Sequence, residues 1–180
     1  MSVQIRRWTG AGPTKTNITD INTRCNAEDA HSTEGTDNPI LVPEAGTTHY
    51  SYWVTTGLYY DGTDTGTIDN LKWFASADPF DGDTGVSGTV NKVTSAQYVQ
   101  ATGTPGETGT ILTDHTHIAA ALAMGDQTSA SPLELDGTVT DPNDEDFGDL
   151  VVFQVVVGST AGAGATTSPT LTWRYDSTIA

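Results

Sequence analysis

The stretch Asp149–Gly158, DLVVFQVVVG, is the longest apolar run in the chain. Read with the two-residue period of a β-strand, both of its faces are apolar except at Gln154. One face carries Val151, Phe153, Val155 and Val157, and the other carries Leu150, Val152, Gln154 and Val156. Its β-branched residues favour a strand over a helix, and a bilayer-crossing helix would need about 20 residues. We therefore expect a central strand that is covered on both faces.

Two parts of the chain are candidates to provide this cover. Thr48–Tyr60, THYSYWVTTGLYY, is the strongest alternating stretch and is expected to close one face. It is long for one strand, so Gly57 is expected to mark a bulge or bend. Residues 9–47, or a neighbouring subunit, are expected to close the other face.

Short strands separated by Gly- and Asp-rich turns fill most of the remaining chain. Alternating patterns predict strands at residues 1–8 (an edge strand), 68–75, 89–93, 98–101, 133–139 and 170–175. One helix is predicted at His115–Met124, because alanine favours helices, Asp114 can cap its start and Gly125 can end it. The pattern predicts an all-β fold, an antiparallel β-sandwich of jelly-roll type with one short helix.

The chain is expected to form one globular unit with a long N-terminal extension. Residues 1–47 are predicted to be an arm and wrapping segment, because they carry few apolar side chains, and residues 48–180 to be the sandwich domain. Arg6 and Arg7 are two of only seven Lys and Arg residues. They suggest either an ordinary terminal ion pair or an arm that docks on an acidic neighbouring subunit.

The strongly acidic composition limits the partners. A formal net charge of −16 argues against direct binding to nucleic acid or to an anionic membrane. Cys25 is the single cysteine, so neither an intrachain disulfide nor a Cys-based zinc site is expected. No signal peptide or membrane-spanning segment is apparent in the sequence, which suggests synthesis in a cytosol.

Three acidic loops are candidate calcium sites, because calcium binds carboxylate and carbonyl oxygens. They span Asp61–Asp69, Asp78–Asp83 and Asp141–Asp149. The third is the densest, and its proposed ligands are Asp141, Asn143, Asp144 and Asp146. None has the spacing of an EF-hand, and a solvated acidic turn is the simpler explanation of each loop. No other cofactor is predicted.

Other candidate sites each have a structural explanation. His115 and His117 have metal-like spacing only if they lie on a strand, and the predicted helix would point them apart. Trp53, Tyr59, Trp73 and Tyr50 suggest either a sugar-stacking platform or core packing. The sequence lacks a G-x-S-x-G motif and a lysine-bearing phosphate loop, and its many acids fall mostly in turns. We therefore predict no catalytic residue and no enzymatic activity.

Three parts of the chain together resemble small β-sandwich structural proteins of tailed viruses and phages. They are YSYWVTTGLYY followed by IDNLKWF, the apolar DLVVFQVVV, and the final TLTWRYDS. The resemblance covers about a quarter of the chain and carries over no functional residue. It implies a virion component: a capsid decoration (cement) protein, a minor capsid protein, or a tail or neck protein.

The predicted function is therefore that of a non-enzymatic virion structural protein, most simply a decoration or minor capsid protein. It would bind other virion proteins such as the major capsid protein, and would be a homo-oligomer, with a trimer as one candidate. Two alternatives stay open at this stage. One is a carbohydrate- or receptor-binding module, and the other is a subunit of an extracellular filament that assembles by strand donation.

Overall fold

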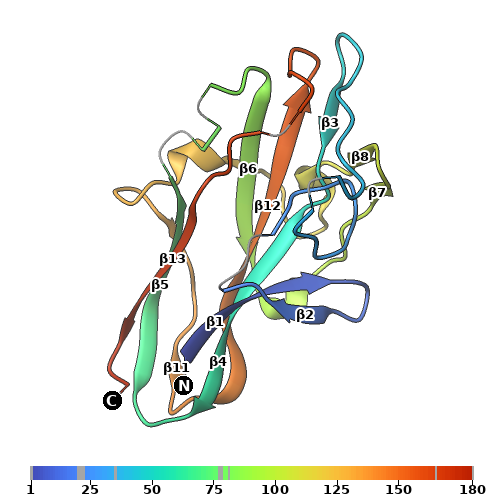
Figure 1. The fold of residues 1–180 in the computed structure, drawn as a ribbon. Helices are drawn as coiled ribbons and strands as arrows, with labels where there is room; N and C mark the ends of the chain where they lie inside the picture. Colours follow the sequence, from blue (N-terminus) through green and yellow to red (C-terminus); the bar gives the residue numbers. More distant parts are fainter. Residues whose placement is uncertain are drawn as a thin grey trace.

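The computed structural model describes residues 2–19, 23–34, 36–76, 79–80, 82–164 and 166–179. They form antiparallel β-sheets joined by loops and three short 3-10 turns (Figure 1). The strands are β1 (Ser2–Thr9), β2 (Thr14–Asn17), β3 (Thr48–Tyr50), β4 (Val54–Thr63), β5 (Thr67–Ala75), β6 (Val86–Val93), β7 (Gly103–Thr104), β8 (Thr108–Gly109), β9 (Leu122–Ala123), β10 (Leu133–Glu134), β11 (Val139–Thr140), β12 (Asn143–Gly158) and β13 (Leu171–Ser177). The 3-10 turns are η1 (Ser95–Gln97), η2 (Leu112–Asp114) and η3 (Met124–Asp126). The prediction of a mainly β, antiparallel fold is confirmed.

β12 is the centre of the main sheet, as the apolar run predicts. The strand order of this sheet is β2-β1-β4-β12-β6-β9, and β3 pairs with the end of β12. β12 starts at Asn143, before the apolar run, because its first residues already pair with β4. Its apolar residues from Leu150 to Val157 are buried except Val156, which is partly buried, and Val151 and Val152 are fully inaccessible to solvent.

A second, smaller sheet is built on β5. β13 pairs with one side of β5, while β10 and β11 pair with the other side. Trp73 of β5 stacks on Phe153 of β12, with ring centroids 6.2 Å apart. Leu71 and Ile68 join the same core cluster, so the Val151 and Phe153 face of β12 is closed largely by β5.

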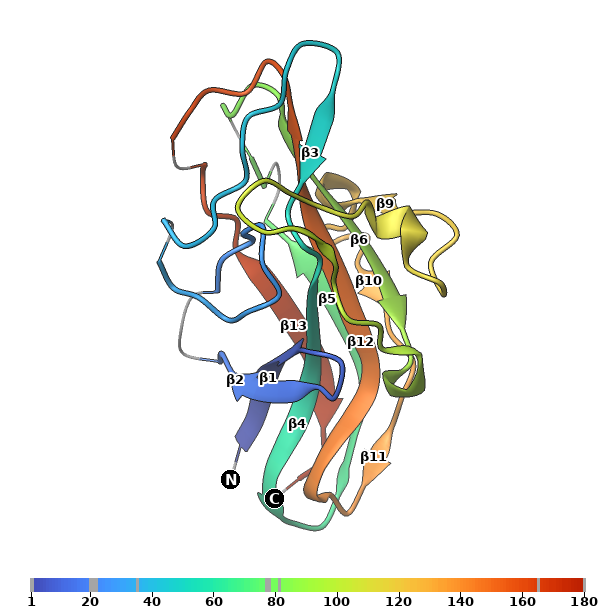
Figure 2. The same cartoon turned by 90° about the vertical axis from the view of Figure 1, so that its right-hand side faces the viewer.

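The expectation that the strand at residues 48–60 closes a face of β12 is wrong, and residues 9–47 cover only the far end of the Val151 and Phe153 face, where Cys25 and Ile40 pack on the core. β3 and β4, which replace the predicted strand at residues 48–60, lie beside β12 in the same sheet and close neither of its faces. The Leu150 and Val152 face packs instead against the chain's own segment 94–121, together with Trp8 and Trp53. Figure 2 shows this yellow-green segment crossing the main sheet on the side turned to the viewer. A period-two pattern shows that a strand needs cover, but it does not show which loop supplies it.

Gln154 fastens this covering segment to the sheet. Its side chain is fully buried in the middle of β12. Its Nε2 donates to the carbonyls of Ser51 and Thr110, at 2.7 Å each, and its Oε1 accepts from the N–H of Leu112 at 2.8 Å. The one polar position of the apolar run thus satisfies two buried backbone groups, of Ser51 and Leu112, and the part-buried carbonyl of Thr110.

Gly57 lies at an irregularity, as predicted, but the bulge is in β12. Between Phe147 and Val151, β12 has two more residues than the facing part of β4, which contains Gly57. A Cβ atom at Gly57 would lie 2.6 Å from Cδ2 of Leu150. Glycine is needed here because the bulged strand approaches its backbone closely.

The helix predicted at His115–Met124 is wrong. The segment contains only turns, the two residues of β9 and the start of η3. Leu112, Ile118 and Met124 are the buried anchors of this part of the chain, whereas Ala119 and Ala120 are exposed. The alanine run favours a helix, but packing of those anchors against the sheet overrides this weak preference.

The N-terminal region is in part an integral element of the main sheet. The strand predicted at residues 1–8 is β1, but it is not an edge, because it lies between β4 and β2. Arg7 and Trp8 are buried on opposite faces of β1. Beyond β2, the described residues 23–34 and 36–47 run as irregular backbone toward β3. Within the described residues, no helix has the length and apolar character needed to cross a membrane.

Candidate functional site: an apolar pocket on the open side of the sheets

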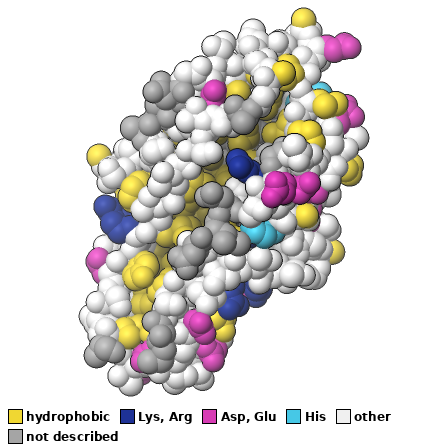
Figure 3. All heavy atoms as spheres, in the orientation of Figure 1, with side chains coloured by type: hydrophobic (Ala, Val, Ile, Leu, Met, Phe, Trp, Pro, Cys, Tyr) yellow, Lys and Arg dark blue, Asp and Glu magenta, His cyan; other side chains and the backbone are white. Residues whose placement is uncertain are grey.

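One side of the molecule leaves part of the apolar core accessible. This accessible part of the core lies between β1 of the main sheet and β13 of the second sheet. Figure 3 shows hydrophobic side chains along a band that crosses this side diagonally. Cys25, Ile40 and Leu171, which are partly buried and pack on the core, lie at this side around the pocket described next.

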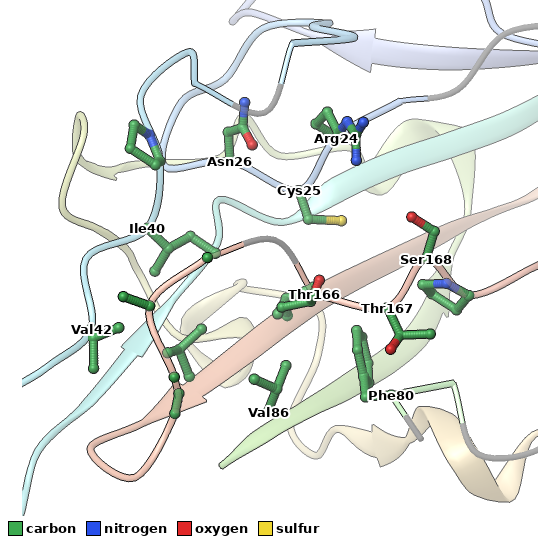
Figure 4. A pocket seen from close by; sticks show the side chains of 18 of the residues that line it. Arg24, Cys25, Asn26, Ile40, Val42, Phe80, Val86, Thr166, Thr167 and Ser168 are labelled. Carbon is green, nitrogen blue, oxygen red and sulfur yellow. The ribbon is translucent and has the colours of Figure 1, made fainter. Parts of the chain in front are cut away.

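A pocket of about 840 Å³ opens within this band (Figure 4). Its apolar part is formed by Phe80, Val86, Met124, Phe153, Val155 and Val157. Residues 23–26 and 39–42 supply one wall, and residues 161–164 and 166–169 supply another. Most of its lining is therefore loop backbone and side chains placed against a rigid sheet.

The pocket exists because the two sheets differ in length. β6 and β12 extend past the ends of β5 and β13 (Figure 1), so no strand of the second sheet covers Val155 and Val157. Among the described residues, the loop before β3 and the loop between β12 and β13 line the pocket above these two valines. Loops fill such a space less completely than a sheet does, and a depression remains.

The polar wall of the pocket is held by internal hydrogen bonds. Asn26 donates from Nδ2 to the carbonyl of Asp37 at 2.6 Å, and its own carbonyl accepts from the N–H of Tyr52 at 2.9 Å. Arg24 donates from Nε to the carbonyl of Thr33 at 3.2 Å. The side chains of Asn26 and Arg24 therefore serve to hold the backbone of the wall in place.

The buried side chain of Arg7 holds this wall through hydrogen bonds to Thr23 and Arg24. It is 1% exposed, and its Nη1 donates to Oγ1 of Thr23 at 2.7 Å and to the carbonyl of Arg24 at 2.8 Å. Among the described residues it forms no salt bridge, and its Nε has no hydrogen-bond partner. Burial of the guanidinium lowers the pKa of Arg7. Arg7 is thus fixed inside this subunit and is not available to a neighbouring one.

The single cysteine borders the same pocket. Burial raises the pKa of the Cys25 thiol to about 11, with a smaller opposing effect from Arg7. Since the thiolate is the reactive form, the thiol is inert near neutral pH. It acts as an apolar part of the pocket wall.

The four residues predicted to bind calcium lie in one turn region, where their side chains have protein partners. Asp141 accepts from the N–H of Gly66 at 2.9 Å, and Asp144 accepts from the N–H of Gly62 at 2.7 Å. Asn143 Oδ1 accepts from the hydroxyl of Thr63 at 2.8 Å, and Asp146 pairs with Lys15 at 2.5 Å. Positive φ angles of 51° at Asp141 and 47° at Asp144 are typical of such turns.

The first of the other two acidic loops forms the connection between β4 and β5. In the first, Asp64 accepts a hydrogen bond from the hydroxyl of Tyr60, which raises the pKa of Tyr60 to about 12. In the second, Asp78 and Asp81 lie outside the described residues. Across the part of the chain that the structure describes, no three His, Cys, Asp or Glu side chains are grouped to hold a metal ion. Calcium binding at Asp141–Asp149 stays a prediction.

His115 and His117 are adjacent but in different environments. His115 is 2% exposed, and its ring lies edge-on to Trp53, with centroids 5.4 Å apart. Its Nδ1 accepts from the N–H of His117 at 3.3 Å, while its Nε2 is buried without a partner. Burial, followed by the charge of His117, lowers the pKa of His115. The pair is part of the cover over the main sheet.

The aromatic residues proposed for sugar stacking do not form a platform. Trp53 and Trp73 are core residues. The guanidinium of Arg6 lies 3.2 Å from the ring centroid of Tyr59, so that ring is already covered. In a chain with few aliphatic residues, the large aromatic side chains are used to fill the interior.

Sequence reasoning missed the pocket itself. One signal was present: residues 40–42 form an apolar Ile-Leu-Val patch in an otherwise polar segment. In the structure Leu41 and Val42 are 49% and 41% exposed at the pocket. Searches against protein-family models, curated proteins and solved structures returned no match for this chain.

Proposed function

We propose that this chain is a non-enzymatic structural protein of a tailed-virus particle, a capsid decoration or minor capsid protein that binds its neighbours through the apolar pocket. The observation that carries the proposal is the exposed apolar pair Leu41 and Val42 at the edge of a pocket with an apolar floor. Exposed apolar surface beside a concave site is characteristic of protein–protein contact.

The character of the pocket favours adhesion over catalysis. Its polar wall residues Arg24 and Asn26 are engaged with backbone groups, and its thiol is protonated at neutral pH. A surface of this kind can bury apolar side chains of a partner, such as the major capsid protein. Affinity would come from removing those side chains from water.

The strand connections support a jelly-roll sandwich as the finer description of the fold. β4, β5 and β6 follow one another in the chain and alternate between the two sheets. β12 then enters the main sheet between β4 and β6. Crossing connections of this kind are typical of jelly rolls, which occur widely in capsid proteins.

Particle binding by surface variants tests the proposal. Leu41→Glu and Val42→Glu place a charge at the pocket, and we expect both to reduce co-sedimentation with purified particles by at least about tenfold, since a charge resists burial. Ile111→Glu is the matched control, because Ile111 is a 37% exposed apolar residue away from the pocket. Equal losses for all three variants, or no binding of the wild-type chain, would contradict the proposal.

A further inference from the structure

β13 presents an open edge of the second sheet. Among the described strands it pairs only with β5, and Arg174, Tyr175 and Asp176 are exposed. Within the described residues, no backbone group of Leu171–Ser177 makes a hydrogen bond outside that pairing. A row of unpaired N–H and C=O groups is a template for another strand.

The pairing of β13 with β5 places like charges side by side. Arg174 lies opposite Lys72, and Asp176 lies opposite Asp69. Lys72 has its own partner, Glu134, at 3.0 Å, whereas Arg174 forms no salt bridge with any described residue. Like charges directly opposite one another destabilise a sheet. Arg174 and Asp176 would therefore each be stabilised by an opposite charge on the open side of β13.

The open edge itself is regular. The register shift between the two strands adds one residue to β5, where Asn70 has a φ of 52°. β13 thus continues past the bulge without an extra residue. Bulges often protect an edge strand from pairing, but here the bulge lies on the inner strand.

We propose that β13 pairs antiparallel with β13 of a second copy of this chain, around a two-fold axis through Tyr175. A two-fold axis perpendicular to the sheet keeps every side chain on its own face, so the central residue opposes itself. Centring on Arg174 or Asp176 would place like charges in contact at the axis. Centring on Tyr175 instead places Arg174 of each copy opposite Asp176 of the other.

The same register also matches the apolar side chains. Leu171 falls opposite Ile179 of the second copy, and both residues already pack partly on the core of their own subunit. The two Tyr175 rings, each 36% exposed, meet at the axis. The pairing joins two four-stranded sheets into one and covers the edge that each monomer leaves open. It does not depend on membership of a virion.

Charge reversal tests the pairing by measuring the dimer dissociation constant in sedimentation equilibrium over a salt series. Arg174→Asp creates two carboxylate pairs across the axis, and we expect at least about a tenfold weaker dimer. The same change puts a carboxylate opposite Lys72, so thermal stability of the monomer should not fall. The double variant Arg174→Asp/Asp176→Arg should restore the dimer. Arg6→Glu, on the main sheet, controls for net charge and should leave the dimer intact.

Cysteine cross-linking tests the register. In a Cys25→Ser background, Tyr175→Cys should form a disulfide-linked dimer, because directly opposite residues bring their Cβ atoms within disulfide reach. Ser177→Cys should not, since it faces Trp173 of the second copy. A monomeric wild type at high concentration, a double variant that stays monomeric, or equal cross-linking at both positions would overturn the proposal.

Discussion

Replacing Gln154 with leucine should separate the covering segment from the main sheet. The substitution keeps the side-chain volume similar but removes three hydrogen bonds, buried ones to Ser51 and Leu112 and a part-buried one to Thr110. Each backbone group left buried and unpaired costs about 1–3 kcal/mol, and the added apolar burial returns about 2 kcal/mol. We therefore expect the free energy of unfolding to fall by about 3 kcal/mol, which lowers Tm by roughly 6–12 °C in a domain of this size.

Denaturant unfolding and hydrogen exchange measure this effect together. Amide protection should fall most strongly in residues 110–118, because their anchor on β12 is lost. Gln100→Leu is the matched control: Gln100 lies in the same segment, and the described structure gives its side chain no hydrogen bond. It should change stability by no more than about 0.5 kcal/mol. A Gln154→Leu variant within 1 kcal/mol of wild type, taking ~1 kcal/mol as the error of such comparisons, would refute the reasoning.

Three further predictions concern His115, Gly57 and Cys25. Acidification should destabilise the fold, because the pKa of His115 is lower in the folded state than in the unfolded state. The stability that comes from burying the neutral imidazole is fully present above the unfolded pKa of about 6.5, and it is lost as the pH falls below that value. His115→Gln should flatten that pH dependence in thermal melts, and an unchanged slope would exclude His115 as the cause. Gly57→Ala should cost about 1–3 kcal/mol in urea unfolding, because its Cβ would lie 2.6 Å from Leu150; a neutral effect would mean that Leu150 moves freely. Cys25 should react with a thiol reagent far more slowly at pH 8 than an unfolded control, since its pKa is about 11; equal rates would show that the thiol is accessible and ionised.

The sequence predicted the β-class of the fold and its central strand. The central strand was predictable because the β-branched residues of Asp149–Gly158 favour a strand, and because a strand that is apolar on both faces has to be covered on both faces. Gln154 was recognised as the polar exception in that run. Its role was not predictable, because its three partners come from residues distant along the chain.

The sequence did not predict the elements whose conformation depends on tertiary contacts. The alanines at 119–121 suggested a helix, but Ile118 packs in the core cluster on the Leu150 face of β12, whereas Met124 packs in the cluster on the Phe153 face. The pocket was missed because it results from the different lengths of two sheets, which no local pattern records. The open edge of β13 was missed for the same reason, since an edge is defined only by strand order.

The most direct test of the proposed function is quantitative mass spectrometry of purified virus particles from cells that produce this chain. The proposal predicts that the chain co-purifies with intact particles in a fixed ratio to the major capsid protein, and that Leu41→Glu lowers that ratio while Ile111→Glu does not. A chain that stays in the particle-free fraction, or a ratio that no pocket variant changes, would contradict it.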